Sequence, residues 1–123
     1  MHAITWFEIP AVDFARATRF YETLLDITLK IDDSFTGCRM AIWPGDRDTV
    51  RGCVFEMKEA HPHADGVRIY LDAGASLAPV LARAESAGGR IVMPPMQISE
   101  EIGHIALVGD TEGNIVGLHA PQA

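Results

Sequence analysis

The chain has 123 residues, of which 48% are hydrophobic and 22% charged, and its formal net charge is −7 at pH 7. That length fits one compact domain with a real core but not two independent ones, and the composition excludes a disordered or low-complexity chain. The excess of acidic residues would repel a phosphate backbone, and no cluster of Lys and Arg offers a local exception, so no nucleic acid is expected as a partner.

The sequence shows no sign of secretion or membrane insertion. No basic segment followed by an apolar run opens it, and no apolar stretch is long enough to cross a bilayer. Cys38 and Cys53 lie in separate strand-like runs, which is typical of two reduced, buried thiols in a cytosolic protein; a disulfide between them is the alternative. We therefore expect a soluble, cytoplasmic protein without a membrane partner.

The first half of the chain predicts a β-α-β-β-β unit. Residues 4–9 alternate as in a strand, and Asp13 can cap the helix that follows, because its side chain accepts hydrogen bonds from free backbone N–H groups. Apolar residues recur in this helix at helical spacing, namely Ala17, Phe20, Tyr21, Leu24 and Leu25. Strands at 27–31, 38–43 and 52–57 complete the unit.

The second half repeats this order. A strand at 67–72 leads to a helix that Ser76 can cap, and Gly88 and Gly89 end that helix. Further strands are expected at 90–93, 104–108 and 114–119. The last two are joined by Asp-Thr-Glu-Gly-Asn at 110–114, residue types that tolerate positive φ angles and bond their own backbone, so a hairpin turn is predicted there.

The repeat defines the organisation of the domain. The two predicted caps, at positions 13 and 76, are equivalent points of the repeat. The single domain of residues 1–123 therefore consists of module one (1–57), a linker (58–66) and module two (67–123). A half of this length buries too little surface to be stable alone. We therefore expect an α+β fold in which two βαβββ modules form one curved, half-barrel-like mixed sheet with the helices outside.

Both ends of the chain carry motifs of a known superfamily. Ile-Thr-Trp-Phe-Glu-Ile-Pro at 4–10 and Asp-Thr-Glu-Gly-Asn-Ile-Val-Gly-Leu-His at 110–119 resemble the vicinal-oxygen-chelate superfamily of glyoxalases, bleomycin-resistance proteins and extradiol dioxygenases, within it a bacterial subgroup of short single-domain members. The resemblance implies the paired β-α-β-β-β plan, a ligand-binding cup and a loop at 93–103 that rims the cup as a mobile edge. It also implies a homodimer, for which the edge strands of two open half-barrels give a physical reason.

Metal-dependent members of the superfamily hold a divalent ion on His and Glu or Gln side chains from the first and last strands of each module. By this resemblance the first-strand positions are Trp6 and Ile69 and the last-strand positions are Gly52 and Gly117, and none of these side chains is a metal ligand. Glu56, further along the strand of Gly52 and on the same face, leaves that alignment open. We expect no metal and no other cofactor.

The cup retains side chains that could bind or react. Trp6 and Glu8 face the same way because side chains alternate along a strand, and a carboxylate desolvated beside an indole is a usable general acid or base. Glu8 is therefore the leading catalytic candidate and His104 the second; the alternatives are an ion pair or dimer contact for Glu8 and a structural role for His104. Residues that could contact a ligand, or else pack in the core, are Trp6, Met40, Trp43, Glu56, Tyr70, Met93, Met96 and His119.

Two functions fit these residues. The first is a metal-independent protein that binds an apolar or aromatic small molecule in the cup, with Trp6 stacking on it and Glu8 fixing a polar group. The second is a lyase, isomerase or dioxygenase-like enzyme that uses Glu8 as a metal-free general base, or a divalent ion held by Glu8, Glu56 and His104. We favour the first function because the cup is retained while its metal ligands are replaced.

Overall fold

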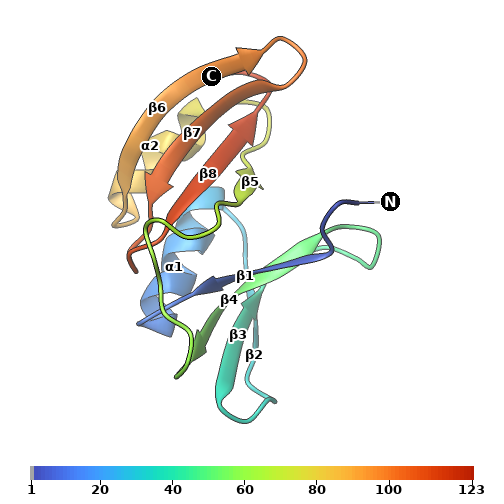
Figure 1. Ribbon diagram of the computed structural model, residues 1–123, viewed down its shortest axis with the longest axis vertical. Coiled ribbons are helices and arrows are strands. Elements are labelled where there is room, and N and C mark those ends of the chain that lie inside the picture. The colour runs from blue at the N-terminus through green and yellow to red at the C-terminus, as the bar shows by residue number, and fades with distance from the viewer. Residues whose placement is uncertain (1) are drawn as a thin grey trace.

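Two β-α-β-β-β units follow each other in the computed structural model, which describes residues 2–123 (Figure 1). The first unit consists of β1 (Trp6–Pro10), α1 (Phe14–Leu25), β2 (Lys30–Asp32), β3 (Cys38–Ile42) and β4 (Arg51–Met57). The second consists of β5 (Tyr70–Asp72), α2 (Ala78–Ser86), β6 (Arg90–Ser99), β7 (Gly103–Gly109) and β8 (Ile115–Ala120). The α+β class and the repeat predicted from the sequence are confirmed.

Each unit forms its own four-stranded mixed sheet. The strand order is β1-β4-β3-β2 in the first sheet and β5-β8-β7-β6 in the second. β1 runs parallel to β4 and β5 runs parallel to β8, whereas the other neighbouring strands are antiparallel. Within residues 2–123, β1 and β5 are edge strands that are not paired with each other. The predicted glyoxalase-like arrangement of two βαβββ modules is confirmed, with one four-stranded sheet in each module, and the two sheets diverge from β1 and β5 (Figure 1).

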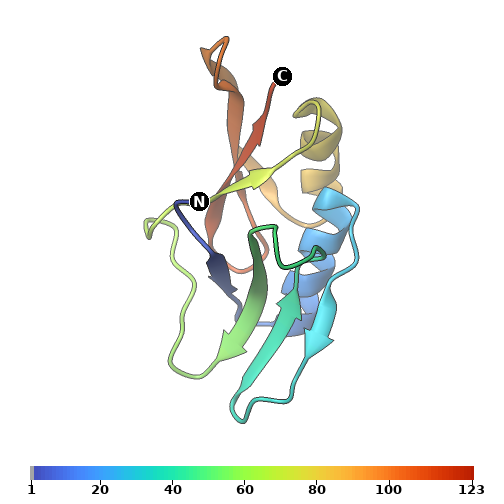
Figure 2. The same cartoon turned by 90° about the vertical axis from the view of Figure 1, so that its right-hand side faces the viewer.

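The helices cover one face of each sheet. Figure 2 shows α1 and α2 on the same side of the molecule, where the two helices contact each other. Phe20, Tyr21 and Leu24 of α1 are the largest fully buried helix residues, and they join side chains of both sheets in one core. Within the described part of the chain, the opposite face of each sheet carries no helix. No helix within residues 2–123 is long and apolar enough to span a membrane.

The two helices begin differently. Asp13 caps α1 as predicted, and its Oδ1 accepts a 3.1 Å hydrogen bond from the backbone N–H of Arg16. The predicted cap Ser76 is wrong, because α2 starts two residues later and Ser76 forms a β-bridge with Gln122. Leu77 is fully buried, and its N–H donates to the Gln122 carbonyl at 3.1 Å, so tertiary contacts determine where this helix begins.

Strand boundaries in module two also differ from the prediction. β5 is shorter than expected because only residues 70–72 pair with β8, and Val67 is 98% exposed. β6 extends to Ser99, so most of the segment expected to form a rim loop at 93–103 is strand. Its pairing with β7 shifts register three times, and such bulges accommodate Pro94 and Pro95, whose nitrogens cannot donate to a ladder.

The turn at 110–114 folds as the sequence predicts. Oδ1 of Asp110 accepts hydrogen bonds from the backbone N–H groups of Glu112 (2.8 Å) and Asn114 (2.9 Å). Gly113 has a φ of +104°, a backbone conformation that favours glycine. The N–H of Asp110 closes the hairpin by donating to the Asn114 carbonyl at 3.0 Å.

Glu112 in this turn contacts the start of α1 in module one. Its side chain is fully buried and accepts hydrogen bonds from the backbone N–H groups of Val12 (2.9 Å) and Asp13 (2.7 Å), from the Thr111 hydroxyl (2.7 Å) and from Nε of Arg16 (2.7 Å). Burial opposes the charge of this carboxylate, but the donors around it outweigh burial, so the pKa of Glu112 lies below its usual value.

Two further side chains of the turn reach module one. The Tyr21 hydroxyl donates to Oδ2 of Asp110 at 2.7 Å, and Nδ2 of Asn114 donates to the Pro10 carbonyl at 2.9 Å. Burial and the neighbouring Asp110 raise the pKa of Tyr21 well above its usual value. We call Asp110, Glu112 and Asn114, together with their partners in module one, the inter-module lock.

Candidate functional site

One face of the module-one sheet points away from α1. Ile9, Val54 and Ala41 are paired neighbours on β1, β4 and β3, and all three are buried in the core on the helix side. The residues that alternate with them lie on the opposite face, which we call the open face of module one. Its central residues are Trp6, Glu8, Met40, Cys53 and Phe55.

Trp6 and Glu8 share the open face, as their alternation predicts. Nε1 of Trp6 donates a 3.3 Å hydrogen bond to Oε2 of Glu8, and Trp6 is 40% exposed. Within residues 2–123, Oε1 of Glu8 has no protein hydrogen-bond partner. Glu8 is exposed and lines a crevice of about 60 Å³ against β8, so a single chain does not enclose this carboxylate.

Cys53 lies directly opposite Glu8 in the parallel pairing of β1 and β4. Sequence reasoning missed this contact because it placed Gly52, not Cys53, beside the first-strand residues. Burial, with the charge of Glu8 nearby, raises the pKa of the Cys53 thiol to about 12. The thiol therefore stays protonated near neutral pH and gives apolar surface rather than a nucleophile. Cys38 and Cys53 are both free thiols.

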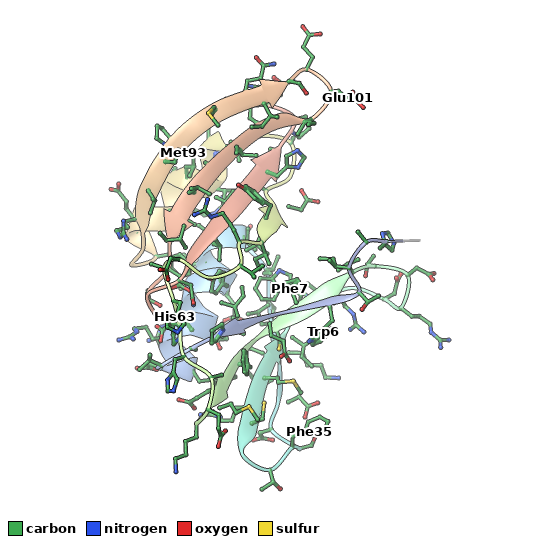
Figure 3. The ribbon with its side chains drawn as sticks, in the orientation of Figure 1. Trp6, Phe7, Phe35, His63, Met93 and Glu101 are labelled. Carbon is green, nitrogen blue, oxygen red and sulfur yellow. The ribbon has the colours of Figure 1, made fainter. Side chains whose placement is uncertain are left out.

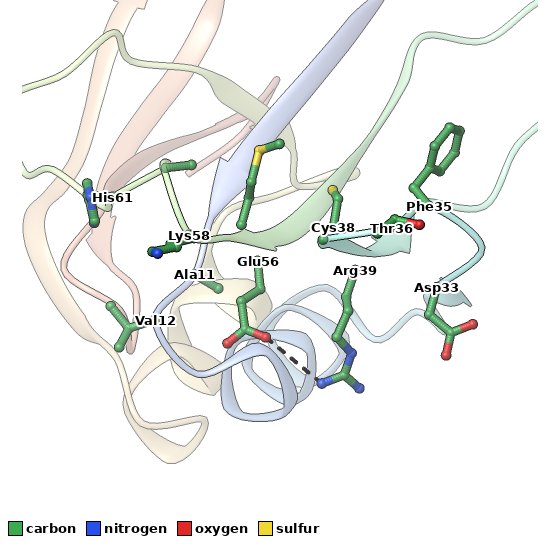
Figure 4. Close-up of a pocket in the computed structure, with 13 residues that line it drawn as sticks. Ala11, Val12, Asp33, Phe35, Thr36, Cys38, Arg39, Glu56, Lys58 and His61 are labelled. Atoms are coloured by element: carbon green, nitrogen blue, oxygen red, sulfur yellow. Dashed lines mark ion pairs between the residues drawn. The ribbon is translucent and has the colours of Figure 1, made fainter.

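Glu56 belongs to the other face of β4. It alternates with Cys53 and Phe55, shares the helix-side face with Gly52 and Val54, and forms a 3.9 Å ion pair with Arg39 (Figure 4). This pair lines a pocket of about 700 Å³ at the end of the sheet, where Asp33, Lys58 and His61 add charges of both signs. The structure therefore does not bring Glu56 and Gly52 to the face of Trp6 and Glu8.

The open face of module two is defined in the same way. Leu71 and Leu118 are paired and buried in the core, so their neighbours Tyr70 and Gly117 lie on the opposite face. A methyl group on Gly117 would collide with the ring of Tyr70, which covers this glycine. Ile69, expected by the repeat to face the cup, packs against the core instead.

β6 adds two predicted residues to this second open face. Met93 pairs with Leu107 and Met96 pairs with Ile105, and both partners alternate with the buried core residues of β7. Met96 is 47% exposed, whereas Met93 is half-buried. The methionines thus share a face with Tyr70 and lie on a different sheet from Trp6 and Glu8.

The two candidate histidines face opposite sides of their sheet. His119 pairs with Ile105 on the open face, whereas His104 pairs with the buried Ala120 on the helix side. Nδ1 of His104 lies 3.0 Å from the carbonyl of Pro121, and Nε2 of His119 is bonded to the carbonyl of Ile102. A carbonyl only accepts, so each of these ring nitrogens carries a proton and donates it.

Trp43 lies on the helix side of β3 and not on the open face. Its ring packs edge-on against Phe7, with centroids 5.0 Å apart, and lies 5.7 Å from the ring of Tyr21. Phe7 precedes Glu8 on β1, and Figure 3 shows Phe7 and Trp6 on opposite sides of that strand. The predicted ligand residues Trp6 and Trp43 therefore belong to two different surfaces.

The residues of the metal-dependent alternative do not converge. Within residues 2–123, no group of three or more His, Cys, Asp and Glu side chains lies close enough to hold a metal ion. Glu8 lies on the open face of module one, Glu56 on the helix side of the same sheet, and His104 on the helix side of module two. Absence of a metal from the functional protein stays a prediction for the experiments below.

Similar solved structures identify the fold. A glyoxalase I mutant from Zea mays matches 94% of this chain with a TM-score of 0.70 at 19% identity, and this chain covers 45% of that maize chain. A glyoxalase/bleomycin resistance protein from Albidiferax ferrireducens T118 matches with a TM-score of 0.66 at 16% identity, over 97% of this chain and 98% of that one. This chain has the vicinal-oxygen-chelate fold.

A further solved structure matches this chain over nearly the whole length of both chains. A glyoxylase/bleomycin resistance protein/dioxygenase domain from Frankia sp. EAN1pec has a TM-score of 0.68 at 12% identity, and the match covers 98% of both chains. No protein-family profile and no curated protein matches the sequence. The vicinal-oxygen-chelate fold supplies the scaffold here, and the chemistry has to be argued from the two open faces and the pockets.

Proposed function

We propose that this protein binds an apolar or aromatic small molecule on the open face of module one without a metal ion, and that Trp6 and Glu8 hold it. The hydrogen bond from Trp6 Nε1 to Glu8 Oε2 carries this proposal, because it fixes a carboxylate beside an aromatic surface. The similar structures include a glyoxalase I mutant and a glyoxalase/bleomycin resistance protein, and both names are in line with a small-molecule ligand.

The residues around Trp6 and Glu8 favour a ligand that has an aromatic ring and one hydrogen-bond donor. Met40, Cys53 and Phe55 surround it with apolar and polarizable atoms, and the Cys53 thiol stays neutral. A ring stacked on Trp6 would displace water from Glu8, and Oε1 would then accept an O–H or N–H group of the ligand. The same Glu8 carboxylate is the general base of the enzymatic alternative, which links the two functions.

A second copy of the chain completes the site in this proposal. Trp6 and Met57 are each 40% exposed on this face, and β1 and β5 leave sheet edges next to it. Apolar side chains and free edges are surfaces that self-association commonly covers. We therefore propose a homodimer in which the partner closes the open face over the ligand.

The chain offers a direct test, because it has only two tryptophans. In ¹⁵N-labelled protein treated with EDTA, 2-naphthol should shift the indole N–H signal of Trp6 saturably, and signals are assigned with Trp6→Phe and Trp43→Phe. Glu8→Gln should weaken binding about 5-fold or more, since a charge-assisted hydrogen bond is lost. Glu56→Gln, on the other side of the sheet, is the matched control and should bind normally.

The outcomes separate the alternatives. A Trp6 signal that 2-naphthol leaves unchanged, or binding that appears only after manganese, zinc, nickel or iron is added, would refute the proposal. If one metal ion per chain remains after desalting and is lost in Glu8→Ala, the metal-dependent enzyme becomes the working hypothesis.

A further inference from the structure

A second pocket lies between the modules, on the other side of β1 from Trp6. It has a volume of about 460 Å³, which is within the range of small-molecule sites. Phe7 and Trp43 of module one, Leu25 and Ile27 from the end of α1 and beyond, and Tyr70 and Leu71 of β5 form its walls. We call it the seam pocket, because it opens where the edge strands β1 and β5 diverge.

The walls of the seam pocket suit a flat ring. Phe7 and Trp43 meet edge to face, with an interplanar angle of 71°, and Tyr70 presents a ring that is 45% exposed. Aromatic side chains in this arrangement attract further aromatic groups beyond the gain from area burial. Within residues 2–123 the indole N–H of Trp43 has no hydrogen-bond acceptor. Every fully buried side-chain nitrogen in these residues has a partner, so the unpaired nitrogen of Trp43 is not fully buried and can donate to a ligand.

The charge at the mouth of the pocket selects a cation. Among the described residues, 2–123, Asp72 is the only carboxylate that lines it, and His2 and Tyr70 are the other titratable groups there. Oδ1 of Asp72 accepts the backbone N–H of Gly74 at 2.8 Å, while Oδ2 has no partner within residues 2–123. The net charge of −7 adds a field that disfavours anions.

We propose that the seam pocket is a second ligand site, and that it binds a small aromatic amine. The ring lies among Phe7, Trp43 and Tyr70, and the ammonium group lies at Asp72. An aromatic cation gains from the faces of these rings and from the carboxylate at once. This site stands independently of the proposed function, because Phe7 and Trp6 lie on opposite sides of β1 (Figure 3).

Three probes with the same ring test the proposal: 2-phenylethylamine, 2-phenylethanol and phenylacetate. In ¹⁵N-labelled full-length protein, the amine should shift the indole signal of Trp43 saturably and leave that of Trp6 unchanged. We expect the amine to bind about 10-fold more tightly than the alcohol, as a charge-assisted hydrogen bond allows, and phenylacetate to bind most weakly.

Variants identify the source of that preference. Asp72→Asn keeps an oxygen for the N–H of Gly74, so it should fold; it should remove the preference for the amine while the affinity for the alcohol changes less than about 2-fold. Asp65→Asn changes the net charge equally at an exposed linker position and should keep the preference. The proposal fails if no probe shifts Trp43 saturably, if the amine shifts Trp6 instead, or if Asp65→Asn and Asp72→Asn have equal effects.

Discussion

The Glu112 carboxylate is negatively charged and buried away from water. Hydrogen-bond donors of the protein replace water around it and stabilise its charge. Each of its oxygens accepts short hydrogen bonds, from Arg16 and Thr111 on one and from two backbone N–H groups on the other. A buried carboxylate is costly unless it is satisfied in this way. The carboxylate therefore stabilises the fold only as long as it keeps its charge.

Glu112→Gln should lower the free energy of unfolding by about 2–3 kcal/mol, because it removes the charge and turns one acceptor into an NH₂ group that faces donors. Urea denaturation measures this change. Glu56→Gln is the matched control: its partner Arg39 is 3.9 Å away and both side chains are partly exposed, so a change within about 0.5 kcal/mol is expected.

The acid dependence of stability provides a second readout of the same substitution. The pKa of Glu112 is lowered in the folded protein, so its contribution is present above the unfolded value of about 4.3 and is lost as the pH falls through the lower, folded value. The wild type should thus lose more stability than Glu112→Gln as pH falls below about 4.3. Parallel acid profiles for the two proteins would show that the charge is not the cause.

At the scale of strands, both modules place an aromatic ring against a glycine of the last strand. Tyr70 covers Gly117 on the open face of module two, and Phe7 covers Gly52 on the helix side of module one. Neither glycine needs a positive φ angle, so the ring, and not the backbone conformation, excludes a larger residue. Gly117 is a packing partner of Tyr70 and not simply a lost ligand.

Gly117→Ala should cost about 1–3 kcal/mol of unfolding free energy, because the added methyl group collides with the ring of Tyr70. In a Tyr70→Ala background the same substitution should cost much less, and the double-mutant cycle measures this coupling. Gly52→Ala provides the contrast, since its methyl group would also meet the backbone carbonyl of Phe7, which truncation of Phe7 does not remove. Equal costs of Gly117→Ala with and without the ring would contradict this explanation.

Elements determined by contacts between residues close in the sequence could be predicted, whereas elements determined by contacts between distant residues could not. Asp13 bonds a backbone N–H three residues away, so its role could be predicted, as could that of the turn at 110–114. Ser76 failed as a cap because Gln122, far along the chain, holds the start of α2. Such pairing leaves no local pattern.

The candidate site shows the same limit. Alternation placed Trp6 and Glu8 on one face correctly, because they belong to one strand. Which residues of β4 join them depends on the register between strands, and this register brings Cys53 rather than Gly52 or Glu56 to Glu8. Whether β1 and β5 pair at their edges likewise depends on a contact between the modules, and no local residue pattern encodes such a contact.

The whole molecule is held together by the helix contact and by the inter-module lock. Tyr21 is the lock residue whose ring also reaches the centre of the core, since it is fully buried and packs near Phe20 and Trp43. Its hydroxyl bonds Asp110 of the other module. Loosening this contact should therefore affect both modules together, and we expect one cooperative unfolding transition.

Tyr21→Phe should lower the free energy of unfolding by about 1–2 kcal/mol, because Asp110 loses a donor. The raised pKa of Tyr21 means that its contribution is present below the unfolded value of about 10 and is lost as the pH rises towards the folded value, so Tyr21→Phe should also flatten the alkaline loss of stability. Urea denaturation from pH 7 to 11 measures both effects. Tyr70→Phe, the only other tyrosine, should change stability by less than about 0.5 kcal/mol. A larger loss in Tyr70→Phe than in Tyr21→Phe would contradict the role of the lock.

The inter-module lock also determines when module one can complete its contacts during translation. Its hydrogen bonds join residues between 89 and 104 positions apart, so during translation the partners of Arg16 and Tyr21 are made long after module one itself. Module one leaves the ribosome first, and the Arg16 guanidinium and the Tyr21 hydroxyl stay without these partners until the β7–β8 hairpin has left the exit tunnel. A nascent chain that stops before Asp110 would have every strand of module one but none of the lock's hydrogen bonds, so chaperones and proteases would meet a partly folded protein.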